Sequence, residues 1–150
     1  FMNRGGTAMT PVDLPLVAGQ IAVPLTGANT TTCFSPTASF TAENFPRRAR
    51  LRGFANLFGS SANTTVNVQY AYSNDGGTTW VIIPGSAART RVSSAADEDR
   101  TVNVAGEMDL TVGLTYQFGL AFSATPSANL TVYCANQARI HNRNGTAVPY

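Results

Sequence analysis

The sequence predicts an all-β protein: an antiparallel two-sheet β-sandwich, jelly-roll-like, with an extended N-terminal arm. First, about eight to ten short segments alternate apolar and polar side chains, which is the period of a half-buried strand. Second, turn-forming residues separate these segments, and no stretch has the period of an amphipathic helix. Third, 150 residues is the length of one domain, which can bury about two thirds of its unfolded surface.

Residues 1–19 are predicted to form the arm, and residues 20–150 the single sandwich domain. Gly and Pro interrupt the arm, so it has neither strand nor helix periodicity. It is richer in apolar side chains than a disordered tail, which is explained if the arm lies along a neighbouring subunit. A frayed terminus is the alternative. The candidate interface residues of the arm are Arg4, Met9, Val12, Leu14 and Leu16.

The first two strands of the sandwich are predicted over residues 20–26 and 31–40. Pro24 restricts the first strand to the edge of a sheet, because proline has no N–H to donate to a neighbouring strand. Pro36 requires a bulge or a break in the second strand for the same reason.

The third strand, residues 47–58, separates two kinds of side chain. Its odd positions from residue 49 onward are small or apolar, whereas Arg48, Arg50 and Arg52 occupy even positions and therefore face the other way. We expect this row of arginines to form ion pairs with another subunit, because arginine is enriched at protein interfaces. Two alternatives remain open: contact with the phosphates of a nucleic acid, and an ordinary solvated face.

Residues 63–83 are predicted to form a β-hairpin that contains the only Trp of the chain. Its turn is rich in Asn, Asp and Gly, which tolerate positive φ. The turn resembles the Asp-box repeated in sialidases and other β-propellers, where the box is a folding element away from the catalytic site. We therefore interpret it as a structural turn, with a sugar-contacting surface as the alternative. The matching residues are Ser73, Asp75, Gly77, Thr79 and Trp80.

The rest of the chain is predicted to contain short strands near residues 90–93 and 101–104, with an acidic loop or a single helical turn between them. Two longer strands follow, over residues 114–123 and 130–141. Each has large apolar side chains on one face and polar or small ones on the other. Residues 124–127 are predicted to turn the chain between them.

The titratable residues form no recognisable catalytic or metal-binding motif. His141 is the only histidine, which leaves no multi-histidine metal site, and the sequence has no G-x-S-x-G nucleophile motif. We therefore expect a non-enzymatic protein with no catalytic residue, no metal ligand and no cofactor. The acidic residues fall in segments interpreted as loops or turns, where pairing with arginines of another subunit is preferred over a Ca²⁺ site. They are Asp97, Glu98, Asp99, Glu107 and Asp109.

Cys33 and Cys134 are the only cysteines, and they are predicted on the second and the last strand. These strands can be neighbours in a sandwich, so a disulfide is geometrically feasible. The sequence carries no sign of an oxidising compartment, and two thiols are therefore favoured over a bridge.

The composition indicates a polar but weakly charged surface. Charged residues make up 12% of the chain, the net charge is +2, and all ten basic residues are Arg. Such a surface suits packing against other proteins. The positive charge is too small to indicate a nucleic-acid partner, and no apolar run approaches the ~20 residues that cross a membrane.

The chain as a whole resembles small jelly-roll virion proteins of tailed bacteriophages, of the capsid decoration (cement) or head-fibre type. The resemblance rests on the arm, on ARLRGF at 49–54, on the hairpin, and on the late strands at 114–122 and 130–140. It implies a homo-oligomer, preferably a trimer, that binds the major capsid protein or another virion protein. Binding would use the arm and one edge of the sandwich. Such a protein assembles in the host cytoplasm and lies on the capsid exterior.

Two other functions are compatible with the sequence. A carbohydrate-binding β-sandwich module, as at the tip of a phage fibre, needs exposed aromatic side chains, and Tyr133 and Tyr150 are the candidates. A coat protein that itself forms a shell needs a strongly basic arm for genome packaging. Arg4 is the only basic residue in the first 46, which argues against that function.

Overall fold

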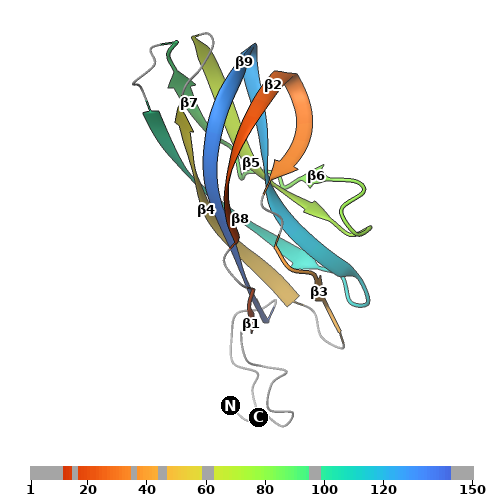
Figure 1. Ribbon diagram of the computed structural model, residues 1–150. Coiled ribbons are helices and arrows are strands. Elements are labelled where there is room, and N and C mark those ends of the chain that lie inside the picture. The colour runs from red at the N-terminus through yellow and green to blue at the C-terminus, as the bar shows by residue number, and fades with distance from the viewer. Residues whose placement is uncertain are drawn as a thin grey trace.

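A computed structural model of the protein describes residues 12–14, 17–34, 37–43, 47–58, 63–94 and 99–142, and these residues form strands and connecting loops (Figure 1). None of them belongs to a helix that could cross a membrane. The all-β class predicted from the sequence is confirmed. The strands are β1 (Val12–Asp13), β2 (Val17–Phe34), β3 (Phe40–Thr41), β4 (Arg47–Phe58), β5 (Thr64–Ser73), β6 (Val81–Ile82), β7 (Ala88–Val92), β8 (Asp99–Leu110) and β9 (Thr115–Asn142).

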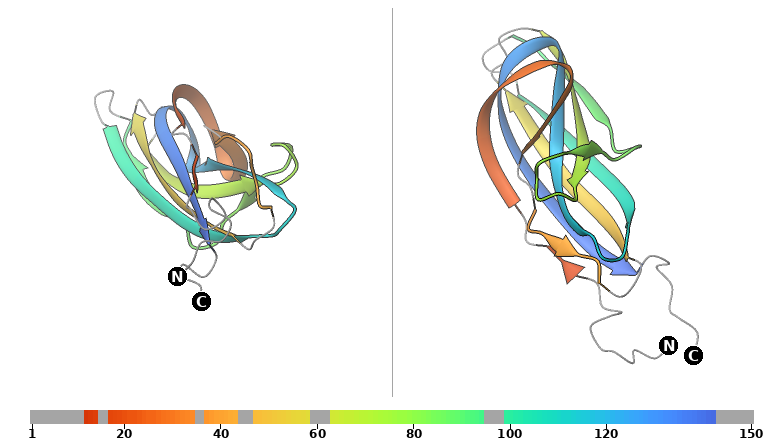
Figure 2. Two further views of the ribbon diagram at one scale, coloured as in Figure 1. Left: turned by 90° about the horizontal axis from the view of Figure 1, so that it is seen from below. Right: turned by 90° about the vertical axis from the view of Figure 1, so that its right-hand side faces the viewer.

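The long strand β9 connects the two layers of the sandwich. Its first part, residues 117–125, pairs with β5, and its last part, residues 131–142, pairs with β4. Between these parts the strand arches over one end of the molecule without ending (Figure 2). β2 follows it antiparallel on both sides of the arch, with register shifts between Leu25 and Thr32. The antiparallel two-sheet sandwich predicted from the sequence is therefore confirmed, although hydrogen bonds continue from one sheet into the other.

The order of strands in each layer follows from these pairings. One layer runs from β2 through the last part of β9 to β4 and ends at β8. The other layer runs from β2 and β3 through the first part of β9 to β5, and β6 and β7 pair with the far side of β5. The last strand is therefore central in the sheet, as its regular alternation predicts.

The core lies between the layers and is built from the alternating side chains predicted for it. β4 contributes its odd positions, including Leu51 and Leu57, and β9 contributes its large even positions, including Phe118 and Phe122. Each side chain of this size contributes about 1.5–3 kcal/mol when it is removed from water. The arginines at even positions of β4 consequently lie on the outer face of its layer.

Tyr70 links the two layers through the core. It comes from β5, its side chain is fully buried, and burial raises the pKa of its hydroxyl. Its ring reaches β4 at Gly53, where an added Cβ would lie 2.6 Å from the tyrosine oxygen and 2.6 Å from the Ala135 carbonyl oxygen. Glycine therefore provides the space that the tyrosine occupies.

The described part of the predicted arm belongs to the sandwich. Val12 and Asp13 pair with the end of β9, and the N–H of Leu14 donates to the Ala138 carbonyl at 2.9 Å. Leu14 is only 6% exposed and packs in the core, so its prediction as an interface residue is wrong. β2 begins at Val17, which places the predicted boundary at residue 19 within a strand. Arg4, Met9 and Leu16 lie outside the described residues, as does the side chain of Val12.

Two predicted segments also differ in length from the observed strands. β8 is one strand of 12 residues where the sequence indicated a short strand, residues 101–104, and acidic loops. The predicted turn at residues 124–127 lies within β9, because these residues bend the strand without ending it. Both differences arise because pairing with neighbouring strands stabilises an extended backbone that local propensity alone does not favour.

Candidate interaction face

The predicted structural turn between β5 and β6 is confirmed, and Ser73 is its centre. The Ser73 hydroxyl donates to Asp75 Oδ1 at 2.7 Å and accepts the N–H of Gly77 at 2.9 Å. Asp75 Oδ1 also accepts the N–H of Thr79 at 2.8 Å. Gly76 and Gly77 have φ angles of 72° and 89°, which favour glycine.

The charge of Asp75 is stabilised by this turn. Hydrogen bonds from the Thr79 N–H and from the side chains of Ser73 and Thr79 lower the pKa of Asp75 to about 2. All of these bonds are local, and Trp80 lies within reach of the turn because a Cβ at Gly77 would be 3.9 Å from its ring. The residues of the Asp-box-like motif therefore hold the loop in shape.

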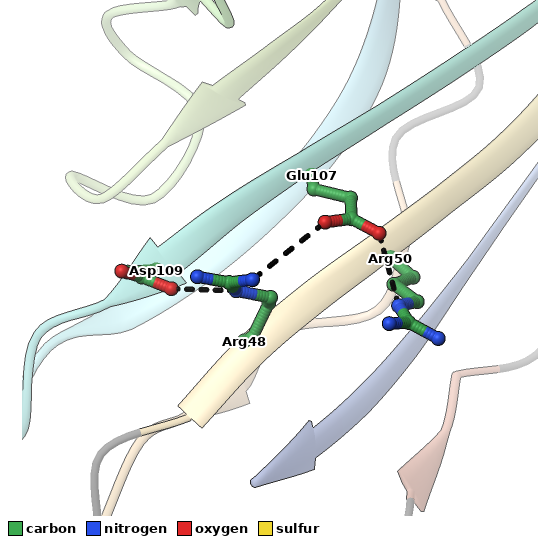
Figure 3. Close-up of polar contacts among 4 residues, drawn as sticks. All are labelled: Arg48, Arg50, Glu107 and Asp109. Carbon is green, nitrogen blue, oxygen red and sulfur yellow. Dashed lines mark hydrogen bonds and ion pairs between the residues drawn. The ribbon is translucent and has the colours of Figure 1, made fainter. Parts of the chain in front are cut away.

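The arginine row of β4 pairs with acidic residues of the adjacent strand. Arg48 Nε lies 2.8 Å from Asp109 Oδ1, and Arg50 Nε lies 2.9 Å from Glu107 Oε1 (Figure 3). Glu107 also lies 3.8 Å from Arg48 Nη1, so the four charges form one chain across the two strands. Hydrogen bonding to Asp109 raises the pKa of Arg48.

Arg48 and Arg50, which the sequence predicts to pair with another subunit, therefore have ion-pair partners within their own chain. The antiparallel register sets Arg48 opposite Asp109 and Arg50 opposite Glu107, so each acid is the nearest neighbour on the same face. Glu107 and Asp109 also lie on a strand, not in the loops expected for them. Within the described residues, no group of three His, Cys, Asp or Glu side chains could hold a metal ion.

Further charges extend the same face toward β9 and β1. Arg139 of β9 stands opposite Arg50, and its Nε lies 3.4 Å from Asp13 Oδ1. This contact attaches β1 to the face through a side chain as well as through the backbone. Arg52, the third arginine of the row, is exposed and lies opposite Ala105 on one side and Gln137 on the other.

Two aromatic side chains follow the arginines on the outer face of β4 and β9. Phe54 follows Arg52 on the outer side of β4, and its ring centroid lies 5.9 Å from that of Tyr133 on β9, with a 40° angle between the planes. Tyr133 is 41% exposed, as predicted for a strand-face side chain. Polar residues, Asn56 and Gln137 among them, lie beside this pair.

The sequence analysis assigned Phe54 no role, although the necessary signal was present. Phe54 continues the even positions that place Arg48, Arg50 and Arg52 outside, so the same alternation puts its ring on the outer face. Tyr133 could be paired with it only once the register between β4 and β9 was known. Tyr150, the other aromatic candidate, lies outside the described residues.

Cys134 is a buried thiol on the inner side of β9. The backbone register places Cys33 of β2 opposite Ala121, in the other part of β9 from Cys134. The side chain of Cys33 lies outside the description. A thiol at Cys134 is what the sequence analysis favoured.

Comparison with known proteins shows a fold but no family. No family model and no curated protein matches the chain. A chain from the structure of infectious bursal disease virus, Gt strain, superposes with a TM-score of 0.51 and 8% identity over 91% of this chain. The match spans 34% of that virus chain, about a third of its length. At such identity the likeness establishes a jelly-roll-like β-sandwich and nothing about function.

Two further solved structures are less similar. The CBM22-1 xylan-binding domain of Paenibacillus barcinonensis Xyn10C has a TM-score of 0.44 and 12% identity, with 90% of this chain and 97% of that domain covered. Eiger TNF from S. frugiperda has a TM-score of 0.45 and 10% identity, with 91% and 99% covered.

Proposed function

We propose that this chain is a non-enzymatic structural protein of a virus particle, a capsid decoration protein that binds and stabilises the capsid lattice. The jelly-roll-like sandwich and its likeness to a chain of a virus structure support the first part. The outer face of β8, β4 and β9 supports the second. Its partner would be the major capsid protein or another virion protein, and its place the capsid exterior after assembly in the host cytoplasm.

The observation that carries the proposal is the pair of exposed Tyr133 and half-buried Phe54, which lies beside a row of arginines restrained by ion pairs. Aromatic and arginine side chains provide most of the binding energy at protein interfaces. Arg48 and Arg50 are restrained by their ion pairs with Asp109 and Glu107, so little side-chain freedom remains to be lost when a partner covers them. Acidic neighbours also keep these charges compensated when water is excluded.

The predicted interface residues of the arm outside the described residues are also part of the proposal. Arg4, Met9 and Leu16 precede or flank β1, which runs beside Arg139 on the edge of the proposed face. A partner that covers Arg139 would therefore also lie beside β1. Contacts made by the outer face and contacts made by the arm residues would then contribute together to binding.

Binding to capsids of the encoding virus that lack this protein tests the proposal. Co-sedimentation of purified protein with such capsids measures an apparent Kd for the native chain and for Tyr133→Ala. We expect truncation of an exposed aromatic anchor to weaken binding by roughly tenfold or more. Val81→Ala is the matched control, because Val81 is 45% exposed but lies on β6, in the other layer. Equal binding by Tyr133→Ala and the native protein would overturn this assignment.

A second candidate function is carbohydrate binding, which the same aromatic pair favours. The exposed ring of Tyr133 and the half-buried ring of Phe54, flanked by side chains with amide groups, offer an apolar platform and hydrogen-bonding groups to a sugar ring. A glycan array separates the two functions. Glycan binding that is lost in Tyr133→Ala, together with absence of capsid binding, would replace decoration with sugar recognition.

A further inference from the structure

β8 is a long edge strand with one unpaired side. All 12 of its residues, Asp99–Leu110, pair with β4 without a register shift. On its other side no strand of the described residues pairs with it, and it ends the order of strands in its layer (Figure 1). Its inner side chains Val102, Val104 and Leu110 are at most 6% exposed, so the strand is firmly seated on the core.

The other edge strands among the described residues carry features that prevent a strand from pairing with a strand of another molecule. β2 contains Pro24 and register shifts, β6 has two residues, and β7 is a short strand with the exposed arginines Arg89 and Arg91. β8 has no proline, no lysine and no bulge, and its one described charge on the inner side, Arg100, is exposed near the end of the strand. At its centre, Ala105 is exposed and Gly106 has no side chain. An edge of this kind is a template for another strand.

We infer that β8 pairs antiparallel with β8 of a second copy of this chain, about a two-fold axis at Ala105. Two identical strands form such a contact when each residue meets a compatible residue of the partner copy. On the outer face, an axis at Ala105 sets Ala105 opposite its own copy, Glu107 opposite Asn103 and Asp109 opposite Thr101. Each carboxylate then meets an uncharged side chain that can donate a hydrogen bond.

Close to the axis, between residues 102 and 108, the inner face is also complementary. Val104 meets Gly106 and Val102 meets Met108, so a larger side chain stands opposite a smaller or a flexible one. An axis at Glu107 would instead set two glutamates directly opposite each other, which is destabilising, and would pair fewer residues. The Ala105 axis pairs the strand from residue 100 to residue 110.

Pairing through β8 would join two layers into one continuous sheet and place two outer faces side by side. A two-fold pair differs from the trimer that the resemblance to decoration proteins implies. The inference does not rest on the proposed function: a chain that fails to bind capsids can still pair through β8, and the two measurements are separate.

Mass measurement in solution tests the pairing with two matched substitutions. Ala105→Lys places two like charges on the axis, and we expect the dimer's dissociation constant to rise by roughly tenfold or more. Gln137→Lys is the control, because Gln137 lies in the same row of the same face, two strands away, on the far side of Arg52. It should dimerise like the native chain. A native chain that is monomeric or trimeric at micromolar concentration, or an Ala105→Lys variant that dimerises normally, overturns the inference.

Oxidative cross-linking tests the register independently of affinity. Ala105→Cys should give a disulfide-linked dimer under mild oxidation, because each new thiol faces its own copy. Thr101→Cys should not, because residue 101 faces Asp109 of the other copy. The native chain, oxidised in the same way, measures any cross-linking through Cys33 or Cys134. Cross-linking at residue 101 but not at residue 105 contradicts this axis, and circular dichroism melting confirms that each variant is folded.

Discussion

Gly53 shows how a single residue can be required by packing in the core. Tyr70 fills the space above it, and an added Cβ would approach both the tyrosine oxygen and the Ala135 carbonyl to 2.6 Å. One of these neighbours belongs to the backbone and cannot move without disturbing β9. The glycine is therefore a packing requirement and not a turn signal.

Gly53→Ala is expected to reduce the free energy of unfolding by about 1–3 kcal/mol, the usual cost of overpacking a core. Chemical denaturation measures it. Gly106→Ala is the matched control: it lies on the neighbouring strand, and its Cβ would meet Ser86 at 3.3 Å and Tyr70 at 3.6 Å. The control should lose less stability than Gly53→Ala; equal losses would show that the close approach is not the cause.

Asp75 gives the hairpin turn a defined pH dependence. Its pKa in the folded chain is about 2, below the ordinary value of 3.8, so the folded state favours the carboxylate. Its contribution to stability is therefore fully present above 3.8 and is lost as the pH falls through about 2.

We expect the stability difference between the native chain and Asp75→Ala to be constant above pH 4 and to vanish near pH 2. Thermal unfolding at a series of pH values measures it. Thr78→Ala provides a reference in the same loop without a titrating group. A difference that persists unchanged at pH 2 would show that the carboxylate charge is not what holds the turn.

At the scale of elements, β4 and β8 are joined by ion pairs whose energetic contribution is small. The four side chains of the Asp109–Arg48–Glu107–Arg50 chain are 36–58% exposed, so water and salt screen them. The backbone pairing and the buried inner side chains hold the strands together. The charges instead determine what the outer face offers to a partner.

A double-mutant cycle of Arg48→Ala and Asp109→Ala should give a coupling energy below about 1 kcal/mol, decreasing as salt is added. Arg52→Ala, in the same row, serves as the uncoupled reference against Asp109→Ala. A coupling of several kcal/mol that does not respond to salt would mean that the pair is shielded from water in the native assembly.

For the whole molecule, the first and last described strands hold each other. β1 pairs with residues 139–140 of β9, and Leu14 adds a side chain to the core between them. Residues 12–14 are thus part of the folded sandwich.

Leu14→Ala is expected to reduce the free energy of unfolding by about 2–5 kcal/mol, as for other buried leucines. Val81→Ala, at an exposed position, should change it by no more than about 0.5 kcal/mol. Denaturant unfolding of both variants measures the difference. If Leu14→Ala were as stable as Val81→Ala, the Leu14 side chain would not be part of the folded core.

The sequence by itself determined the fold class, the alternation of β4 and β9, and the hairpin turn, because each depends on neighbours a few residues apart. Side chains two positions apart share a face of a strand whatever the strand pairs with. The turn residues Ser73 and Asp75 bond to their own loop for the same local reason.

Only the tertiary structure decided which residues meet across strands. The register between β4 and β8 gives Arg48 and Arg50 partners within their own chain, and the register between β4 and β9 brings Phe54 to Tyr133. Pairing with β9 also places Val12, Asp13 and residues 17–19 of the predicted arm in strands. Residues 124–127, predicted as a turn, are a bend within β9. Register depends on contacts between residues far apart in the chain, and local propensity contains no information about them.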